Sequence, residues 1–240
     1  MTIMRIRNAL FGLTVAFIVS MNAAAAQTPE TEIIDRVDHL VYATADLERG
    51  IAEVENLLGV RATIGGRHPG RGTHNALLAL GPRVYLEIIA PDPEQPEPSE
   101  PRTFGIDQLA GSGLVAWAAN GTDLEEVHRN AVRNRIPVGA VAEGSRNRPD
   151  GVTLTWRFTD PGVGGTDGVI PFFIDWGQSP HPATTSPAGA RLIGFRVEHP
   201  DATAIRQQLR HLGLDVRVDP GPRPALIAII DGPSGRVELR

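Results

Sequence analysis

The chain has 240 residues, a net charge of −5, 23 basic residues that are all Arg, and no Cys. The absence of Lys excludes Schiff-base chemistry, and with it a pyridoxal phosphate enzyme; the absence of Cys excludes a thiol nucleophile, disulfides and thiolate-bound metals. The negative net charge argues against a nucleic acid partner. The sequence contains no phosphate-binding loop, so we expect no nucleotide cofactor.

Residues 1–26 have the features of a secretory signal peptide. Arg5 and Arg7 precede a short apolar run, and Ala24 to Ala26 offer a small-residue cleavage site before Gln27. The run is too short for a membrane span, so we expect a periplasmic or secreted protein that is free of the membrane after cleavage. An uncleaved N-terminal anchor is the alternative.

A unit of strand, Asp-containing turn, amphipathic helix and strand occurs three times, beginning at Val37, Leu114 and Leu192. A repeated unit of this size cannot bury its apolar face alone, so the units must pack on one another. We therefore predict an α+β protein built from three βαβββ-like modules.

The first module, residues 34–90, begins with a strand over 37–43. A helix follows, capped by Thr44 or Asp46 and ended by Gly59. Strands are expected over 60–64, 75–80 and 84–89, with a Gly-rich loop after the first of them.

The second module, residues 114–176, is reached through a Pro-rich crossover, residues 91–103, which is too rich in Pro for a helix or a central strand. Thr122 and Glu125 match a capping box at the start of its helix. The third, shorter module covers residues 191–240, and we expect it to complete or extend the sheet of the first two.

Six segments together resemble the glyoxalase-like domain proteins of the vicinal oxygen chelate superfamily, which includes glyoxalases, bleomycin-resistance proteins and extradiol dioxygenases. They are DHLVYATADL, YLEIIAPD, GGRHPG, GTHNALLALG, GSRNRPDG and FFIDWG. The resemblance covers essentially all of the mature chain. It implies that residues 34–177 form one domain in which two modules curl a mixed sheet into a cup.

The resemblance also implies a divalent metal of unknown identity, held by side chains from the first and last strands of each module. His39 and Glu87 occupy these positions in the first module and Asp175 the last-strand position in the second. Ala116 stands where a fourth ligand is expected. One His with two carboxylates is a known ligand set for a divalent metal with open positions.

The residues themselves support part of this site. Glu87 alternates with Tyr85 and Ile89 in an apolar strand, and a buried carboxylate needs a partner, a proton or a metal. Of His74 and Asn75, one must face the cup by strand alternation, and we choose His74 as a ligand or as the group that moves a proton, a role shared with Glu87.

Substrate contacts are expected from the loop residues Arg67 and His68, from Asn75 and from Trp176. Arg146 and Arg148 form either a second anion clamp or a solvated hairpin tip, and we favour the hairpin tip. We assign no role to His128, His181, His199 or His211.

Two functions remain open. The first is a metal-dependent lyase, isomerase or dioxygenase-type enzyme that binds a small substrate through two vicinal oxygens. The second is a non-catalytic binding or sequestration protein that uses the same cup without metal, which the missing ligand at Ala116 favours. The partner that we expect is a small-molecule ligand, and a homodimer is plausible.

Overall fold

The computed structural model describes residues 34–162 and 167–240. The predicted signal peptide lies outside the described residues, so its cleavage and the location of the protein stay predictions. Among the described residues, no helix is long and apolar enough to cross a membrane.

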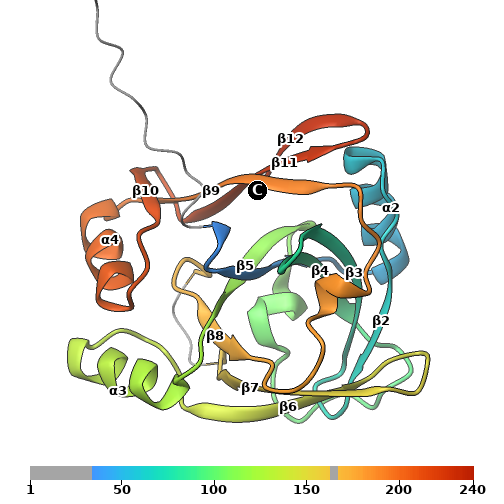
Figure 1. The fold of residues 1–240 in the computed structure, drawn as a ribbon, viewed down its shortest axis with the longest axis horizontal. Helices are drawn as coiled ribbons and strands as arrows, with labels where there is room; N and C mark the ends of the chain where they lie inside the picture. The colour runs from blue at the N-terminus through green and yellow to red at the C-terminus, as the bar shows by residue number, and fades with distance from the viewer. Residues whose placement is uncertain (1–33, 163–166) are drawn as a thin grey trace, which may run out of the picture.

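Eight strands close into a barrel made of two similar halves (Figure 1). Its order is β1-β4-β3-β2-β6-β7-β8-β5, and in each half the first strand pairs in parallel with the fourth. This confirms the predicted α+β cup. The first half contains β1 (Val37–Ala43), β2 (Thr63–His68), β3 (Thr73–Gly81) and β4 (Val84–Pro91), and the second contains β5 (Gly113–Asn120), β6 (Val141–Asn147), β7 (Thr153–Thr159) and β8 (Phe172–Asp175).

The two halves meet at two seams. At one seam β1 and β5 pair antiparallel along most of their length. At the other, β2 and β6 are joined by one register pair, Arg67 with Asn147. Both β2 and β6 run through segments that we expected to be a loop and a hairpin tip, so the side chains of GGRH and GSRN alternate between the barrel interior and the outside.

Short polar residues set the helix ends. Asp46 caps α2 (Leu47–Leu58) by accepting a hydrogen bond of 2.8 Å from the backbone N–H of Arg49, and Gly59 ends the helix with φ of 75°. Asp123, not Thr122, caps α3 (Leu124–Asn134), accepting from the N–H of Glu126 at 2.9 Å. The predicted capping box is wrong because the carboxylate one position later takes the capping role.

The third module forms its own sheet outside the barrel, in the order β10-β9-β11-β12 (Figure 1). It comprises β9 (Arg191–His199), α4 (Ala202–His211), β10 (Arg217–Pro220), β11 (Ala225–Gly232) and β12 (Gly235–Leu239). The expectation that it would complete or extend the first sheet is wrong, because the closed barrel has no free strand edge. Its first strand also pairs in parallel with the strand after its helix, unlike the barrel halves.

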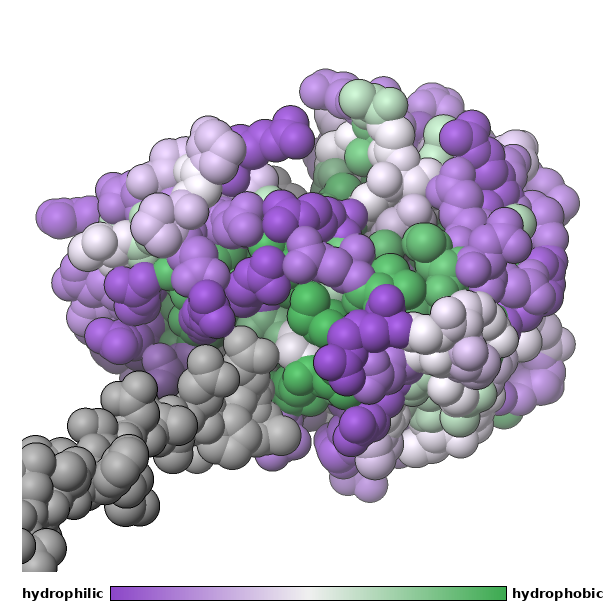
Figure 2. All heavy atoms as spheres, turned by 90° about the horizontal axis from the view of Figure 1, so that it is seen from above, coloured by the Kyte–Doolittle hydropathy of each residue, from purple (hydrophilic) through white to green (hydrophobic). Residues whose placement is uncertain are grey.

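Strand alternation divides the apolar residues between two places. The outer faces of the barrel strands pack under the helices and the third sheet, where Trp117 and Phe195 have ring centroids 4.9 Å apart. The inner faces carry a smaller cluster around Val41, Ile89 and Phe158. Figure 2 views the molecule from above relative to Figure 1 and shows a mostly hydrophilic surface with apolar residues in a recess.

The inner cluster around Val41, Ile89 and Phe158 borders the cavity described next.

Two short 3-10 helices complete the described elements. The helix η1 (Thr103–Gln108) follows the Pro-rich crossover and brings Phe104 to the barrel interior, with a φ of 64° at Phe104. The helix η2 (Pro182–Thr184) follows β8 and precedes β9 in the chain, and His181 comes immediately before it.

Candidate functional site

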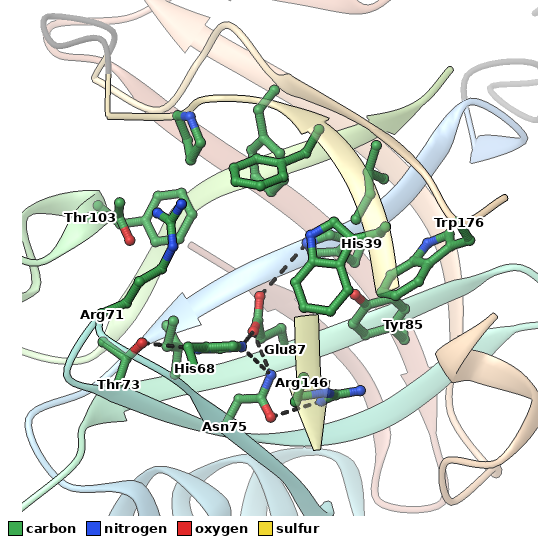
Figure 3. Close-up of a pocket in the computed structure, with 17 residues that line it drawn as sticks. His39, His68, Arg71, Thr73, Asn75, Tyr85, Glu87, Thr103, Arg146 and Trp176 are labelled. Atoms are coloured by element: carbon green, nitrogen blue, oxygen red, sulfur yellow. Dashed lines mark hydrogen bonds and ion pairs between the residues drawn. The ribbon is translucent and has the colours of Figure 1, made fainter. Parts of the chain in front are cut away.

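The barrel interior holds a cavity with about 610 Å³ of empty space, part of it open to solvent. Its floor is polar and comes mainly from the first half of the barrel (Figure 3). Its opposite wall is aromatic and comes from η1, β7 and β8. The cavity therefore offers hydrogen-bonding groups to one side of a ligand and apolar surface to the other, as small-molecule sites commonly do.

Glu87 on β4 is buried and is held from the side by Asn75 on β3. The amide nitrogen of Asn75 donates a hydrogen bond of 2.6 Å to Glu87 Oε1, and its Oδ1 accepts one of 2.9 Å from Nη1 of Arg146. The donor on one side and the acceptor on the other determine which way the amide points. A chain of Arg146, Asn75 and Glu87 thus crosses the floor of the barrel.

His68, at the end of β2, lies beside this chain. Its Nε2 is 3.3 Å from the Asn75 amide nitrogen and its Nδ1 is 2.9 Å from the Thr73 hydroxyl. Burial lowers the pKa of His68 to about 4, although Glu87 acts in the opposite direction. His68 is therefore neutral at pH 7, with Nδ1 donating to Thr73 and Nε2 accepting from Asn75.

His39 on β1 completes the floor. Its Nδ1 donates a hydrogen bond of 2.7 Å to Oδ1 of the preceding residue, Asp38. In the neutral imidazole this leaves a lone pair on Nε2, which lies 3.7 Å from Glu87 Oε2 (Figure 3). The ring is held between Tyr85, stacked at 4.6 Å between centroids, and the edge of Phe172 at 5.4 Å.

Asp38 is buried and accepts hydrogen bonds from three side chains. Besides His39, Nε1 of Trp176 donates to it at 3.1 Å and Nε2 of His181 at 3.2 Å. Burial acts to raise the pKa of Asp38, but the hydrogen bonds from His181 and His39 outweigh it and the pKa lies below its ordinary value. A carboxylate behind an imidazole fixes the tautomer and stabilises the ring when it takes up a proton.

The predicted metal set is not brought together. His39 and Glu87 meet in the cavity, but Phe172, Ile174 and Trp176 are the residues of β8 and its end that line it. Asp175 points the other way and accepts a hydrogen bond of 2.9 Å from the N–H of Gly177. Our alignment of the last strand was therefore wrong by one residue, which moves a side chain to the opposite face.

The second half of the barrel contributes no ligand at the first-strand position either. Ala118 is the register partner of His39, and Ala116 lies on the same inward face. Across residues 34–162 and 167–240, no group of three or more His, Asp or Glu side chains is disposed to hold a metal ion. Of the two residues that do meet, Glu87 already accepts a hydrogen bond from Asn75 through Oε1. The residues present do not fit the expected metal.

Two other predicted site residues face away from the cavity. His74 lies on the outer face of β3, with Nδ1 3.9 Å from Asp92 Oδ1. Arg67 is half exposed and forms ion pairs with Asp92 and Glu94. Both predictions are wrong for one reason: Asn75 and His68 take the inward positions of their strands, so their neighbours must point outward.

The charged and titratable side chains Asp38, His181 and Arg146, and the ring of Tyr85, belong to the site but were not predicted from the sequence. Asp38 and His181 are buried against each other although they lie far apart in the chain, and Arg146 is buried although we favoured a solvated hairpin tip. An acid within an apolar strand was the available signal for Asp38. Burial of Arg146 follows from β6 continuing through GSRN, which the turn residues after it concealed. Nothing in the sequence near His181 distinguishes it.

Comparisons with known proteins agree with this architecture. A family model described as a glyoxalase-like domain matches residues 37–213. The chain therefore belongs to the glyoxalase-like domain family of the vicinal oxygen chelate superfamily. A search of curated protein sequences found no match.

Among solved structures, a hypothetical protein from Staphylococcus aureus is similar with a TM-score of 0.56 and 15% identity, over 84% of this chain and 83% of that one. Methylmalonyl-CoA epimerase from Mycobacterium tuberculosis has a TM-score of 0.40 and 21% identity, over 62% and 92%. The Streptomyces coelicolor methylmalonyl-CoA epimerase in complex with 2-nitronate-propionyl-CoA has a TM-score of 0.43 and 18% identity, over 61% and 98%. At these identities the similarity concerns the fold alone.

Proposed function

We propose that this protein is an exported enzyme that transfers a proton on a small substrate with vicinal oxygens, in the manner of an isomerase or a lyase. The observation that carries the proposal is the placement of His39. Its Nδ1 is held by Asp38 at 2.7 Å while its Nε2 faces the cavity, 3.7 Å from Glu87 Oε2. An oriented imidazole beside a carboxylate is a pair of proton carriers at one place.

In this mechanism Nε2 of His39 takes the proton from a carbon next to a substrate carbonyl. The electrons of the broken C–H bond pass to the carbonyl oxygen, which becomes an enolate. Asp38 stabilises the imidazolium that forms. Return of the proton from His39 to a different carbon or face gives the product; alternatively the acid form of Glu87 gives its proton, and the proton on His39 then passes to Glu87 to restore the starting state. Every group required is a protein side chain.

The alternative is a binding protein that uses the same cavity without catalysis. Two observations favour it: the inward position opposite His39 is Ala118, and Phe104, Phe158 and Phe172 give the cavity an apolar wall suited to holding a ligand. A binding protein has no need for a base oriented by a buried carboxylate, so we place it second.

Proton exchange tests the proposal without knowledge of the natural substrate. The chain from Gln27 onward is incubated in D₂O with small 2-hydroxy ketones and 2-oxo acids, and loss of their α-proton signals is followed by NMR. We expect exchange with wild type, none above background with His39→Gln, and wild-type exchange with His211→Ala, an exposed site. Absence of exchange together with saturable binding would support the binding protein instead. Export is tested by the N-terminal mass of protein recovered from the periplasm or medium.

A further inference from the structure

Arg146 is the most deeply buried arginine of the described residues, with 3% of its surface exposed. Within residues 34–162 and 167–240 no carboxylate lies within ion-pair distance of its guanidinium. Its one hydrogen bond goes from Nη1 to the neutral amide oxygen of Asn75. A buried cation without a paired anion is costly unless a ligand supplies the anion.

Arg146 lines the cavity and keeps further N–H groups besides the one that Asn75 accepts. A guanidinium has five N–H donors, and Arg146 uses one of them. No buried side-chain N or O atom in the described part of the chain lacks a partner, so the other nitrogens of Arg146 are the atoms that keep some exposure. Arg146 lines the cavity inside the barrel.

The neighbouring strand is built to admit this side chain. A Cβ at Gly65 would lie 2.3 Å from Nη1 of Arg146, and one at Gly66 would lie 2.9 Å from its Cγ. Gly66 also has a φ of 146°, and a Cβ there would lie 2.4 Å from the backbone oxygen of Asn147, so the backbone itself requires glycine at 66. The room that the side chains of Arg146 and Asn75 need accounts for the glycine at 65.

Tyr85 adds a second unpaired donor to the same part of the cavity. Tyr85 is 3% exposed and lines the cavity, and no partner for its hydroxyl occurs among the described residues. Burial, with Asp38 and Glu87 nearby, raises the pKa of Tyr85 well above its ordinary value, so the hydroxyl keeps its proton and donates. Figure 3 shows Tyr85 and Arg146 on the side of the cavity away from Arg71 and Thr103.

We propose that Arg146 and Tyr85 form a receptor for a carboxylate of the substrate, whose apolar body lies against the wall of Phe104, Phe158 and Phe172. A guanidinium binds a carboxylate through two parallel N–H···O bonds, a geometry that a neutral amide cannot match. The substrate class is therefore a small apolar or aromatic carboxylic acid. This inference rests on the proposed function in placing the substrate in this cavity.

The competing explanation is that Arg146 only balances the charge of Glu87 through Asn75. That arrangement uses Nη1 alone and leaves the other N–H groups of Arg146 without a hydrogen-bond acceptor in the protein. It also gives no reason for the cavity to prefer an acid over its amide. The two explanations thus differ in a measurable selectivity.

The test is a binding titration of the chain from Gln27 onward, followed by the fluorescence of Trp156 and Trp176, which line the cavity. The probes are benzoate, phenylacetate and 3-phenylpropionate, each paired with its amide. For the wild type we expect the best acid to bind at least about tenfold more tightly than its amide. Arg146→Gln is expected to remove this preference by weakening the binding of the acid more than that of its amide, and Tyr85→Phe to reduce it.

Arg148→Gln is the matched control, because Arg148 follows on the same hairpin and pairs with Asp150 at 2.8 Å. It should bind like the wild type. Circular dichroism establishes that each variant is folded; if Arg146→Gln is not, Tyr85→Phe carries the test alone. The proposal is overturned if no acid binds the wild type, if acid and amide bind equally, or if a folded Arg146→Gln or, in its place, Tyr85→Phe keeps the full preference.

His39→Gln separates this proposal from the proposed function. It should lose proton exchange and keep the preference for acids. If the wild type catalyses proton exchange but does not prefer acids, the proposed function stands and the carboxylate receptor is contradicted. If the wild type prefers acids but catalyses no exchange, the carboxylate receptor stands and the proposed function is contradicted.

Discussion

Nε2 of His181 lies 3.2 Å from Oδ2 of Asp38, although 143 positions separate the two residues in the chain. The other ring nitrogen of His181 accepts a hydrogen bond of 3.2 Å from the N–H of Ala183, so the proton on Nε2 is directed at Asp38. The segment between the barrel and the third sheet thereby supports the carboxylate that orients His39. The geometry of the site depends on this segment as well as on the barrel.

Replacing His181 with Ala should destabilise the fold by about 2 kcal/mol, because a buried carboxylate loses one donor and Ala183 loses its acceptor. The measurement is urea unfolding at pH 7. His211→Ala, at an exposed position near the end of α4, is the control and should stay within about 0.5 kcal/mol of the wild type. Equal midpoints for the two variants would contradict a structural role for His181.

The substitution Asp38→Asn should change the tautomer of His39. An amide at position 38 can donate to Nδ1, which moves the ring proton to Nε2 and removes the lone pair that faces the cavity. We expect α-proton exchange to fall by about 10³-fold or more. Long-range ¹H–¹⁵N correlation spectra report the tautomer directly, and an unchanged His39 pattern would count against the assignment.

Gly65→Ala should damage the floor of the cavity. The new Cβ would lie 2.3 Å from Nη1 of Arg146 and 2.4 Å from Oδ1 of Asn75. Displacing them should cost about 1–3 kcal/mol of stability and remove the preference for carboxylate probes. Gly111→Ala is the matched control, since a Cβ there meets nothing within 4 Å. Thermal unfolding and the titration above measure both effects.

Because of His68, the free energy of unfolding should decrease as the pH is lowered. Its folded pKa of about 4 lies below its ordinary value of 6.5, so the unfolded chain binds the extra proton first. Its contribution is fully present above pH 6.5, is lost as the pH falls toward 4, and amounts to at most about 3 kcal/mol.

This dependence is isolated by comparing wild type with His68→Asn in urea at pH 4.5, 5.5 and 6.5. The difference in unfolding free energy between the two proteins should shrink as the pH falls. A difference that is constant over this range would contradict the burial of a neutral His68. Asp38, whose pKa lies below its ordinary value, acts only at still lower pH.

Purified protein should carry substoichiometric metal, since Asp175 and the alanines of β5 do not complete a ligand set with His39 and Glu87. Elemental analysis of the wild type and of His39→Ala provides the comparison. Treatment with a chelator should leave proton exchange unchanged. A stoichiometric metal that His39→Ala loses would contradict the side-chain mechanism.

Much of the fold was predictable because it depends on short-range patterns. Apolar spacing and polar caps located α2, α3 and α4 and most strands, and the repeated module indicated a curled sheet. The bounds of β2 and β6 were missed because glycines and polar residues there suggested turns. Pairing of β2 with β3 and of β6 with β7, together with the contact of Arg67 and Asn147 across the seam, keeps these segments extended despite their composition.

The site was predictable only in part. His39 and Glu87 were found through the family resemblance, and Glu87 also because a carboxylate within an apolar strand needs a chemical reason. Asp175 and His74 were assigned to the wrong face of the sheet. The face that a side chain occupies depends on the register of its strand, and an error of one residue moves the side chain to the opposite face. Asp38 and His181 meet through the tertiary fold alone.

The repeated module, the helices and the two polar residues His39 and Glu87 at the floor of the cavity can be located from local patterns and family motifs, because these act over a few neighbouring positions. Closure of the barrel, the position of the third module outside it, and the arrival of Arg146, Tyr85 and His181 at the site follow from long-range packing. Register and packing between distant strands control these contacts, and no local pattern encodes which distant strand will be the neighbour.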